Sequence, residues 1–249
     1  AVLSGIEAGL RAQGAAPEDV TMVGFAGDGG TADIGLQALS GAIDRNDDVL
    51  YVCFDNEAYM NTGVQRSSAT PPAARTATTM PTPGHPGNTF GQGKNVPAIA
   101  MAHGIPYVAT ATVADLHDLE HKVKYAMSIH GARYIHVLVP CPLGWGSASS
   151  KTIELARLAQ QTGIFPVFEA EYGEVTHVSK IRRQLPVEAY LKPQKRFAHL
   201  FGKKGDPEII ARLQALADRN IAKYGLLSDE AEPRGVPVPE QGDERQHLI

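Results

Sequence analysis

Two short loops in this chain carry residue types that could bind a divalent cation and a phosphate. Residues 27–30 read Gly-Asp-Gly-Gly, and residues 55–63 read Asp-Asn-Glu-Ala-Tyr-Met-Asn-Thr-Gly. Each loop follows an apolar, β-branched run typical of a buried strand. An open parallel sheet binds its ligands at the carboxyl ends of the strands, so the two loops are expected to lie side by side.

The first loop and the start of the second offer oxygen ligands of the kind that Mg²⁺ prefers. These are a carboxylate, an amide oxygen and a backbone carbonyl, from Asp28, Asn56 and Ala58. Gly29 and Gly30 would let backbone N–H groups approach a phosphate closely. An Asp in a Gly-rich turn usually serves only the turn, so the second loop is what favours a metal site.

The order of the predicted elements indicates how these loops are held. We predict strands at Val20–Phe25, Val49–Phe54, Tyr107–Thr112 and Tyr134–Val139, and helices at Ile34–Ile43, Pro97–His103 and Leu116–Ile129. Strands that alternate with helices indicate an α/β fold. The predicted architecture is a doubly wound, mostly parallel sheet with helices on both faces. Residues 56–95 are rich in Thr, Pro and Gly without a clear period, as functional or disordered loops are.

Three regions follow from this pattern. Residues 1–150 would form the cofactor-binding α/β domain, and 151–227 a C-terminal extension with helices at Lys151–Thr162 and Glu208–Tyr224 and a strand at Phe165–Glu171. Residues 228–249 are charged and Pro-rich, typical of a flexible tail. Ala1–Leu10 has a helical period without a preceding capping residue, so we expect further N-terminal residues in this domain.

Composition excludes several classes of function. The chain has 249 residues, 43% of them hydrophobic and 20% charged, which is ordinary for a globular protein. A formal net charge of −4 gives no nucleic-acid footprint, and no apolar run is long enough to span a membrane. The two cysteines cannot form a disulfide scaffold, and no secretory signal is readable, so we expect a cytoplasmic protein.

From residue 1 to about Leu227 the chain resembles the β subunits of 2-oxoacid:ferredoxin oxidoreductases, of which pyruvate synthase is the best-known member. The motifs that carry the resemblance are Gly27-Asp28-Gly29, Asp33-Ile34-Gly35, residues 59–63, residues 65–71 and Pro140-Cys141-Pro142. The resemblance implies thiamine diphosphate as cofactor, with Asp28, Asn56 and the Ala58 carbonyl as Mg²⁺ ligands. The residues implied near the diphosphate are Gly27, Gly29, Gly30, Thr62 and Gly63.

The resemblance also assigns roles to two further residues. It implies that Asn61 directs its amide at the reacting carbon and the substrate, the alternative being an Asn that only stabilises its loop. It implies that Cys141 is one of four ligands of a [4Fe–4S] cluster, since such clusters need four thiolates. The remaining ligands are not in this sequence, whose only other cysteine is Cys53. Taken alone, a Cys between two prolines is more often a small buried hydrophobic residue.

The implied reaction is the oxidative decarboxylation of a 2-oxoacid, with the acyl group passed to coenzyme A and the electrons to iron–sulfur clusters and then to ferredoxin or an equivalent acceptor. The carboxylate that activates the cofactor comes from another subunit in the resembled family. The chain is therefore expected to work only in a hetero-oligomer. Alternatives are a subunit of a non-oxidative thiamine diphosphate-dependent decarboxylase or synthase, and a structural or electron-relay subunit without the cofactor.

Other candidate residues have simpler interpretations. His117 and His121 have the spacing of a metal pair on a helix, but no Glu directly follows the first His as in the His-Glu-x-x-His pattern, and the helix is charged, which favours a solvated face. Cys53 lies inside a predicted strand and is expected in the core. Lys192, Lys195 and Arg196 form a short basic run. Such a run is usually solvated, and the sharper alternative is contact with a partner subunit or ferredoxin.

Overall fold

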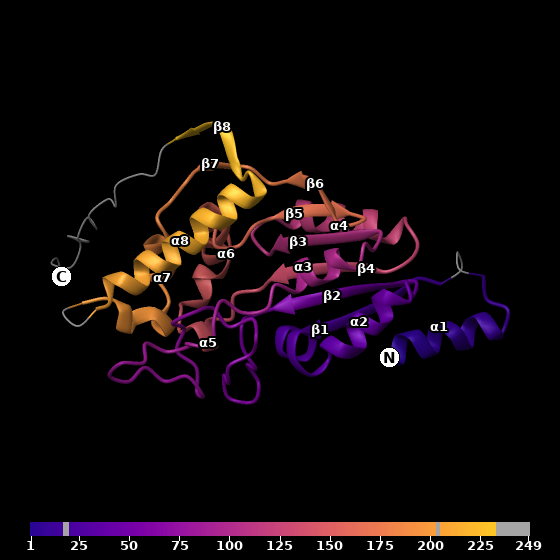
Figure 1. Ribbon diagram of the computed structural model, residues 1–249, viewed down its shortest axis with the longest axis horizontal. Helices are drawn as coiled ribbons and strands as arrows, with labels where there is room; N and C mark the ends of the chain where they lie inside the picture. Colours follow the sequence, from indigo (N-terminus) through magenta and orange to yellow (C-terminus); the bar gives the residue numbers. More distant parts are fainter. Residues whose placement is uncertain (17–19, 203–204, 233–249) are drawn as a thin grey trace, which may run out of the picture.

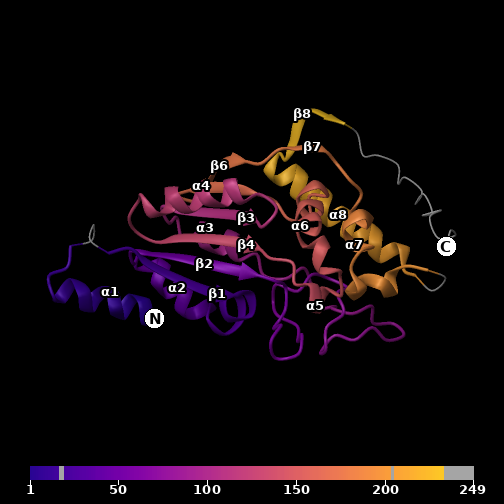
Figure 2. The same cartoon turned by 180° about the vertical axis from the view of Figure 1, so that it is seen from behind.

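A computed structural model of the chain describes residues 1–16, 20–202 and 205–232. The elements are α1 Val2–Ala12, β1 Met22–Gly27, the π-helix η2 Gly30–Ile34, α2 Leu36–Asp44, β2 Val49–Asp55, α3 Val96–Ala102, β3 Tyr107–Thr112, α4 Leu116–Met127, β4 Arg133–Leu138, α5 Pro142–Trp145, η3 Ser149–Lys151, α6 Thr152–Gln161, β5 Phe168–Glu171, β6 Glu174–Val178, β7 Ile181–Arg183, α7 Val187–Leu191, η4 Lys195–Leu200, α8 Pro207–Tyr224 and β8 Leu227–Glu232. Figures 1 and 2 show them from opposite sides.

Six strands form the main sheet in the order β1-β2-β4-β3-β5-β6. The first four are parallel, whereas β5 runs antiparallel to β3 and β6 antiparallel to β5. Gly27 of β1 pairs with Phe54 of β2, and Asp55 of β2 pairs with Leu138 of β4. The strands therefore end at one edge, and the predicted mostly parallel sheet is confirmed.

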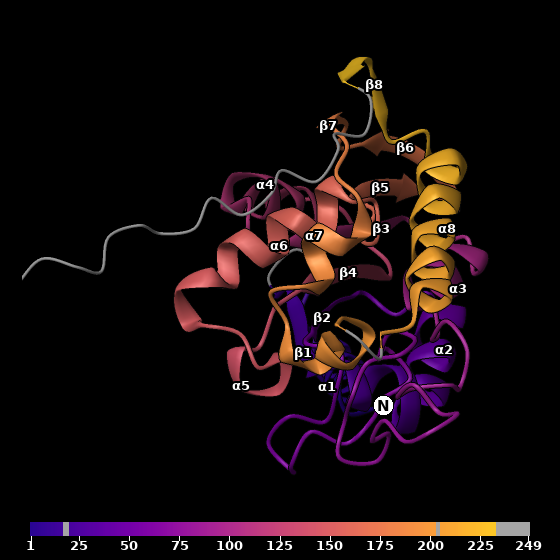
Figure 3. The same cartoon turned by 90° about the vertical axis from the view of Figure 1, so that its left-hand side faces the viewer.

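Helices cover both faces of this sheet, as Figure 3 shows with the sheet seen between two helical layers. One layer contains α2, α3 and α8, and their apolar residues pack with those of β2, β3 and β4. On the other face α4 packs against β3 and β4. The interior strands β3 and β4 are buried along their whole length, which is why apolar residues occur on both sides of each strand. The polar residues of these strands, among them Arg133 and His136, are buried as well.

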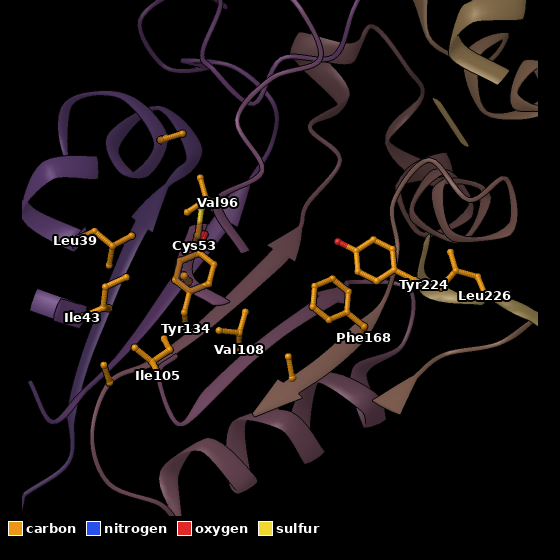
Figure 4. Packing of buried hydrophobic residues seen from close by; sticks show 14 of the residues in the cluster. Leu39, Ile43, Cys53, Val96, Ile105, Val108, Tyr134, Phe168, Tyr224 and Leu226 are labelled. Carbon is orange, nitrogen blue, oxygen red and sulfur yellow. The ribbon is translucent and has the colours of Figure 1, made fainter. Parts of the chain in front are cut away.

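The core between the sheet and the first helical layer joins β2, β3 and β4 to α2, α3 and α8. Its members, most of them labelled in Figure 4, include Leu39, Ile43, Cys53, Val96, Ile105, Val108, Tyr134, Phe168 and Tyr224. Phe168 stacks on Tyr224 at 4.8 Å between ring centroids, which ties α8 to the sheet. Cys53 is fully buried here, as the sequence predicted.

Two aromatic side chains, one on β1 and one on β2, remain exposed near the ends of these strands. Phe25 and Phe54 stack with nearly parallel rings 5.6 Å apart, yet they remain 65% and 42% exposed. β1 is also an edge strand of the sheet. An exposed apolar patch on a sheet edge marks an interaction surface more often than a solvent face.

The C-terminal extension is not separate from the sheet, because it supplies β5 and β6 to it. Its helices α6, α7, η4 and α8 share a second apolar cluster with Trp145 of α5 and with Leu138 at the carboxyl end of β4. The predicted tail lies mainly outside the described residues. Residues 228–232, which begin it, belong to β8 and pair with β7. In the part of the chain that the structure describes, no helix is long and apolar enough to cross a membrane.

Candidate cofactor and metal site

Asp28 lies at the point where β1 turns into the helix behind it, and it is almost wholly buried. The Ser67 hydroxyl donates to its Oδ2 at 2.5 Å, and the Asn56 backbone N–H donates to its Oδ1 at 3.3 Å. Burial and the nearby Asp55 carboxylate raise the pKa of Asp28 to about 7, although both hydrogen bonds act in the opposite direction. A nearby cation would stabilise the charged form of this buried carboxylate.

The three oxygen-bearing groups predicted as ligands do converge. The terminal amide atom of Asn56 that points inward lies 2.7 Å from the Ala58 carbonyl oxygen and 3.1 Å from Asp28 Oδ1. Without a cation the amide can turn its NH₂ toward both oxygens and donate to them. In the other orientation three oxygens face one another, an arrangement that a cation between them would stabilise.

Tyr59, in the loop after β2, contacts the segment that follows β1. Its hydroxyl lies 3.1 Å from the Gly29 carbonyl and 3.0 Å from Asp33 Oδ2, and it can donate to either. Asp33 also accepts bonds from the Ser68 N–H and hydroxyl and pairs with Lys94 at 3.5 Å. Burial raises the pKa of Asp33, but these donors outweigh it and hold the pKa below its usual range. Asp33 is therefore a structural anion that organises the loop.

Gly29 has no room for a side chain, because the Tyr59 ring covers it. A Cβ there would lie 2.4 Å from Tyr59 Cε1, whereas one on Gly30 would meet no atom within 4 Å. Gly29 has ordinary right-handed helical angles, so the ring contact is its only obstacle. We expect Gly29→Ala to lower the free energy of unfolding by about 1–3 kcal/mol, measured by urea denaturation. Gly30→Ala is the matched control, and equal losses in the two variants would contradict the contact.

Asn61, Thr62 and Gly63 lie on an exposed turn beyond Tyr59. The Thr62 hydroxyl donates to the Gln65 side-chain oxygen at 2.5 Å, and the Gln65 amide donates back to the Thr62 carbonyl at 2.9 Å. Gly63 has φ +118°, a conformation that favours glycine. Asn61 is exposed on this turn.

Beside the predicted metal ligands lies a buried ion pair between the neighbouring strands β2 and β4. His136 on β4 donates from Nε2 to Asp55 Oδ2 at 2.8 Å, and its Nδ1 lies 2.7 Å from the Tyr134 hydroxyl. Burial alone would lower the pKa of His136, but the hydrogen bond and charge of Asp55 raise it to about 10. The imidazolium therefore offsets part of the negative charge gathered around Asp28.

The raised pKa of Asp28 predicts a pH-dependent stability. The carboxyl binds its proton more tightly in the folded chain than in the unfolded chain, where its pKa is near 3.8. The stabilisation is thus complete below about pH 4 and is lost as the pH rises through about 7. We expect the metal-free complex to lose a few kcal/mol of stability between pH 4 and pH 7, followed by calorimetry. Asp28→Asn should reduce this slope to the part that comes from Glu57, whose pKa is also raised to about 7. An unchanged slope would contradict the assignment.

Cys141 lies three residues beyond the end of β4, half-buried and with a free thiol, at the start of the short helix α5. It packs at the margin of the second apolar cluster. His117 and His121 are both exposed on α4, as the solvated-face interpretation predicted. Among the described residues no cluster of three or more His, Cys, Asp or Glu side chains forms a metal site. The predicted ligands Asp28, Asn56 and the Ala58 carbonyl include only one such side chain, so they do not form a cluster of this type.

The basic run was predicted wrongly in one respect. Lys192 and Lys195 are exposed, but Arg196 is 4% exposed and pairs with Glu57 at 2.5 Å. Burial raises the pKa of Glu57 to about 7, and Arg196 acts against that rise. No individual role was predicted for Ser67, Asp55 or His136. A signal existed for Asp55, which ends its strand in the same way that Asp28 follows β1.

These features define the class of protein. Residues 2–137 match the family model described as the C-terminal TPP binding domain of thiamine pyrophosphate enzymes. The chain is 53% identical over 226 residues to the pyruvate synthase subunit PorB of Methanosarcina barkeri, covering 91% of this chain and 76% of that protein. It is 48% identical over 207 residues to the ketoisovalerate oxidoreductase subunit VorB of Pyrococcus horikoshii, covering 80% of this chain and 66% of that protein.

A further relative is the PorB subunit of Methanocaldococcus jannaschii, 48% identical over 231 residues, with coverage of 91% of this chain and 76% of that protein. The fold and the family model thus identify a thiamine diphosphate-binding enzyme subunit. The chain belongs to the β subunits of the 2-oxoacid:ferredoxin oxidoreductases. The resemblance found in the motifs, the α/β fold and the oxidoreductase class are confirmed.

Proposed function

We propose that this chain binds thiamine diphosphate through Mg²⁺ and forms half of the active site of a CoA-acylating 2-oxoacid oxidoreductase. The observation that carries the proposal is the convergence of Asp28, Asn56 and Ala58 at the carboxyl edge of the sheet. The substrate class is a 2-oxoacid, as the names of the pyruvate synthase and ketoisovalerate oxidoreductase relatives imply. The electron acceptor is ferredoxin or an equivalent carrier.

The spacing of the three oxygens supports magnesium. In an octahedral Mg²⁺ site with bonds of about 2.1 Å, neighbouring ligand oxygens lie about 3 Å apart. The separations of 2.7 Å and 3.1 Å in this set are close to that value. Asp28 would supply the carboxylate, Asn56 its amide oxygen and Ala58 its carbonyl, which leaves the other positions of the octahedron for diphosphate and water.

Backbone groups beside the metal ligands suit a diphosphate. Gly29 and Gly30 open the helix that follows β1, where the first N–H groups of a helix have no intrahelical partner. We assign Gly27, Gly29 and Gly30 to one side of the diphosphate and Thr62 and Gly63 to the other. When bound, thiamine diphosphate supplies a carbon nucleophile for the 2-oxo group and a sink for the electrons that decarboxylation leaves. Asn61 would orient the substrate carbonyl beside it.

Cys141 is proposed as a ligand of a [4Fe–4S] cluster whose other ligands lie outside this sequence. Its position after β4, at the same edge as the cofactor loops, supports a short route for electrons. The thiolate must stay reduced, which fits the proposed cytoplasmic setting. We expect Cys141→Ser to lower the iron content of the intact complex by about four atoms per β subunit, measured by iron analysis and EPR. Wild-type iron content in the variant would rule out this ligand.

Partner subunits are part of the proposal. Four acidic residues near the site are already engaged, namely Asp28, Asp33, Asp55 and Glu57. We assign the carboxylate that activates the cofactor to another subunit. The exposed residues Phe25, Phe54 and Ile34 beside the site support extensive subunit contact. Thiamine diphosphate titrated into the metal-free intact complex should bind only when Mg²⁺ is added, and metal-independent binding would contradict the proposed site.

A further inference from the structure

The turn that carries the proposed metal ligands is strained, and part of what holds it comes from outside the sheet. Glu57, between Asn56 and Ala58, has φ +65°, a left-handed conformation uncommon for residues other than glycine. This conformation lets the Asn56 amide and the Ala58 carbonyl point at Asp28 together. It also turns the Glu57 side chain into the interior, where only 13% of it is exposed. Strained backbone persists only where its surroundings fix it.

Arg196 of η4 is the counter-ion of Glu57. Its Nη2 lies 2.5 Å from Glu57 Oε2, and its guanidinium lies over the Trp145 ring with a 3.8 Å separation from the centroid. Gln194, fully buried, accepts a bond from Arg196 Nε at 2.8 Å, and the Tyr190 hydroxyl accepts another from Nη2 at 3.3 Å. The contacts with Gln194 and Tyr190 therefore orient the guanidinium toward the Glu57 carboxylate.

Trp145 contacts the same turn directly. Its indole N–H donates to the Asn56 carbonyl at 2.9 Å, and the residue is fully buried. Trp145 and Arg196 are thus stacked on each other, and each contacts a different residue of the metal-binding turn. Both come from the segment after β4, and the sheet itself supplies neither contact.

We propose that Arg196 is a positioning residue that, with Trp145, holds the turn of residues 56–58 in its metal-binding conformation. The C-terminal extension would then set the affinity for Mg²⁺ without touching the metal. Outer partners that orient metal ligands commonly change metal affinity about 10–100-fold when removed. The inference rests on the proposed function, because the ligands it concerns are those assigned above.

The test uses the intact complex, stripped of metal and cofactor, and measures the Mg²⁺ concentration that gives half-maximal thiamine diphosphate binding by calorimetry. Arg196→Met should raise that concentration about 10–100-fold. Arg196→Lys, which keeps the charge, should recover part of the loss. Trp145→Phe, which removes the N–H but keeps an aromatic ring, should also raise it.

Arg133→Met is the matched control. Arg133 is 2% exposed and pairs with Asp48, but it begins β4, at the opposite end of the sheet from the metal ligands. It should lower thermal stability and leave the Mg²⁺ concentration unchanged. If Arg196→Met or Trp145→Phe assembles and needs no more Mg²⁺ than wild type, the positioning role is overturned. Failure of the wild-type complex to bind thiamine diphosphate would instead overturn the proposed function.

Discussion

Asp28→Ala is expected to abolish Mg²⁺-dependent thiamine diphosphate binding to the intact complex, with a loss of affinity of about 100-fold or more. Asp28 is the one carboxylate among the proposed ligands, and a neutral site would hold Mg²⁺ only through an amide and a carbonyl. The substitution also leaves the Asn56 amide with a single oxygen partner, the Ala58 carbonyl. Catalytic activity should fall with cofactor occupancy.

The chain offers good controls for this experiment. Asp44→Ala removes an exposed carboxylate at the far end of α2 and should change nothing. Asp28→Asn keeps the shape of the side chain and should still lose the metal. Because burial raises the pKa of Asp28, its charge opposes folding near neutral pH, so the metal-free variants should remain folded. Unchanged cofactor binding in both Asp28 variants would show that the chain holds no such site.

The isolated chain is expected to turn over no 2-oxoacid, and the complete complex is expected to be active. The reason is chemical. Glu57 is committed to Arg196 and Asp33 to Tyr59, Ser68 and Lys94. Among the described residues near the site, no acidic group is left to activate the cofactor. The measurement is viologen reduction by the purified chain, alone and after mixing with the other subunits.

Mixing the purified chain with the other subunits should restore viologen reduction if the prediction is correct. The Asp28→Ala chain, added in the same way, should assemble and restore nothing, which separates assembly from catalysis. Steady turnover by the wild-type chain alone, sensitive to Mg²⁺ removal, would mean that the activating carboxylate is in this sequence after all.

Much of the site could be predicted because one rule of parallel sheets governs it. Asp28 and Asn56 both follow apolar strands, and β1 and β2 are neighbours, so the two loops had to meet. The prediction that both strands are buried was wrong for β1, which is an edge strand with mostly half-buried or exposed residues. The metal-ligand geometry then depends on short-range features near each strand end. The interior strands were equally clear, because most residues of β3 and β4 are apolar or β-branched.

Arg196 shows what could not be predicted. In sequence it follows Lys195 and ends a basic run, and nothing local distinguishes a buried cation from a solvated one. Its burial depends on Trp145 and Glu57, which lie 51 and 139 residues away in the chain. The irregular loop of residues 56–95 presents the same difficulty. Ser67 and Lys94 reach Asp28 and Asp33 through tertiary contacts that have no sequence period.

The most direct test of the account is turnover by the intact complex with a panel of 2-oxoacids, coenzyme A and a viologen acceptor. We expect acyl-CoA and CO₂ to form together with reduced viologen, two electrons for each acyl-CoA, and only when thiamine diphosphate and Mg²⁺ are present. Release of an aldehyde or a condensation product without viologen reduction would contradict the account and assign the chain to a non-oxidative thiamine enzyme.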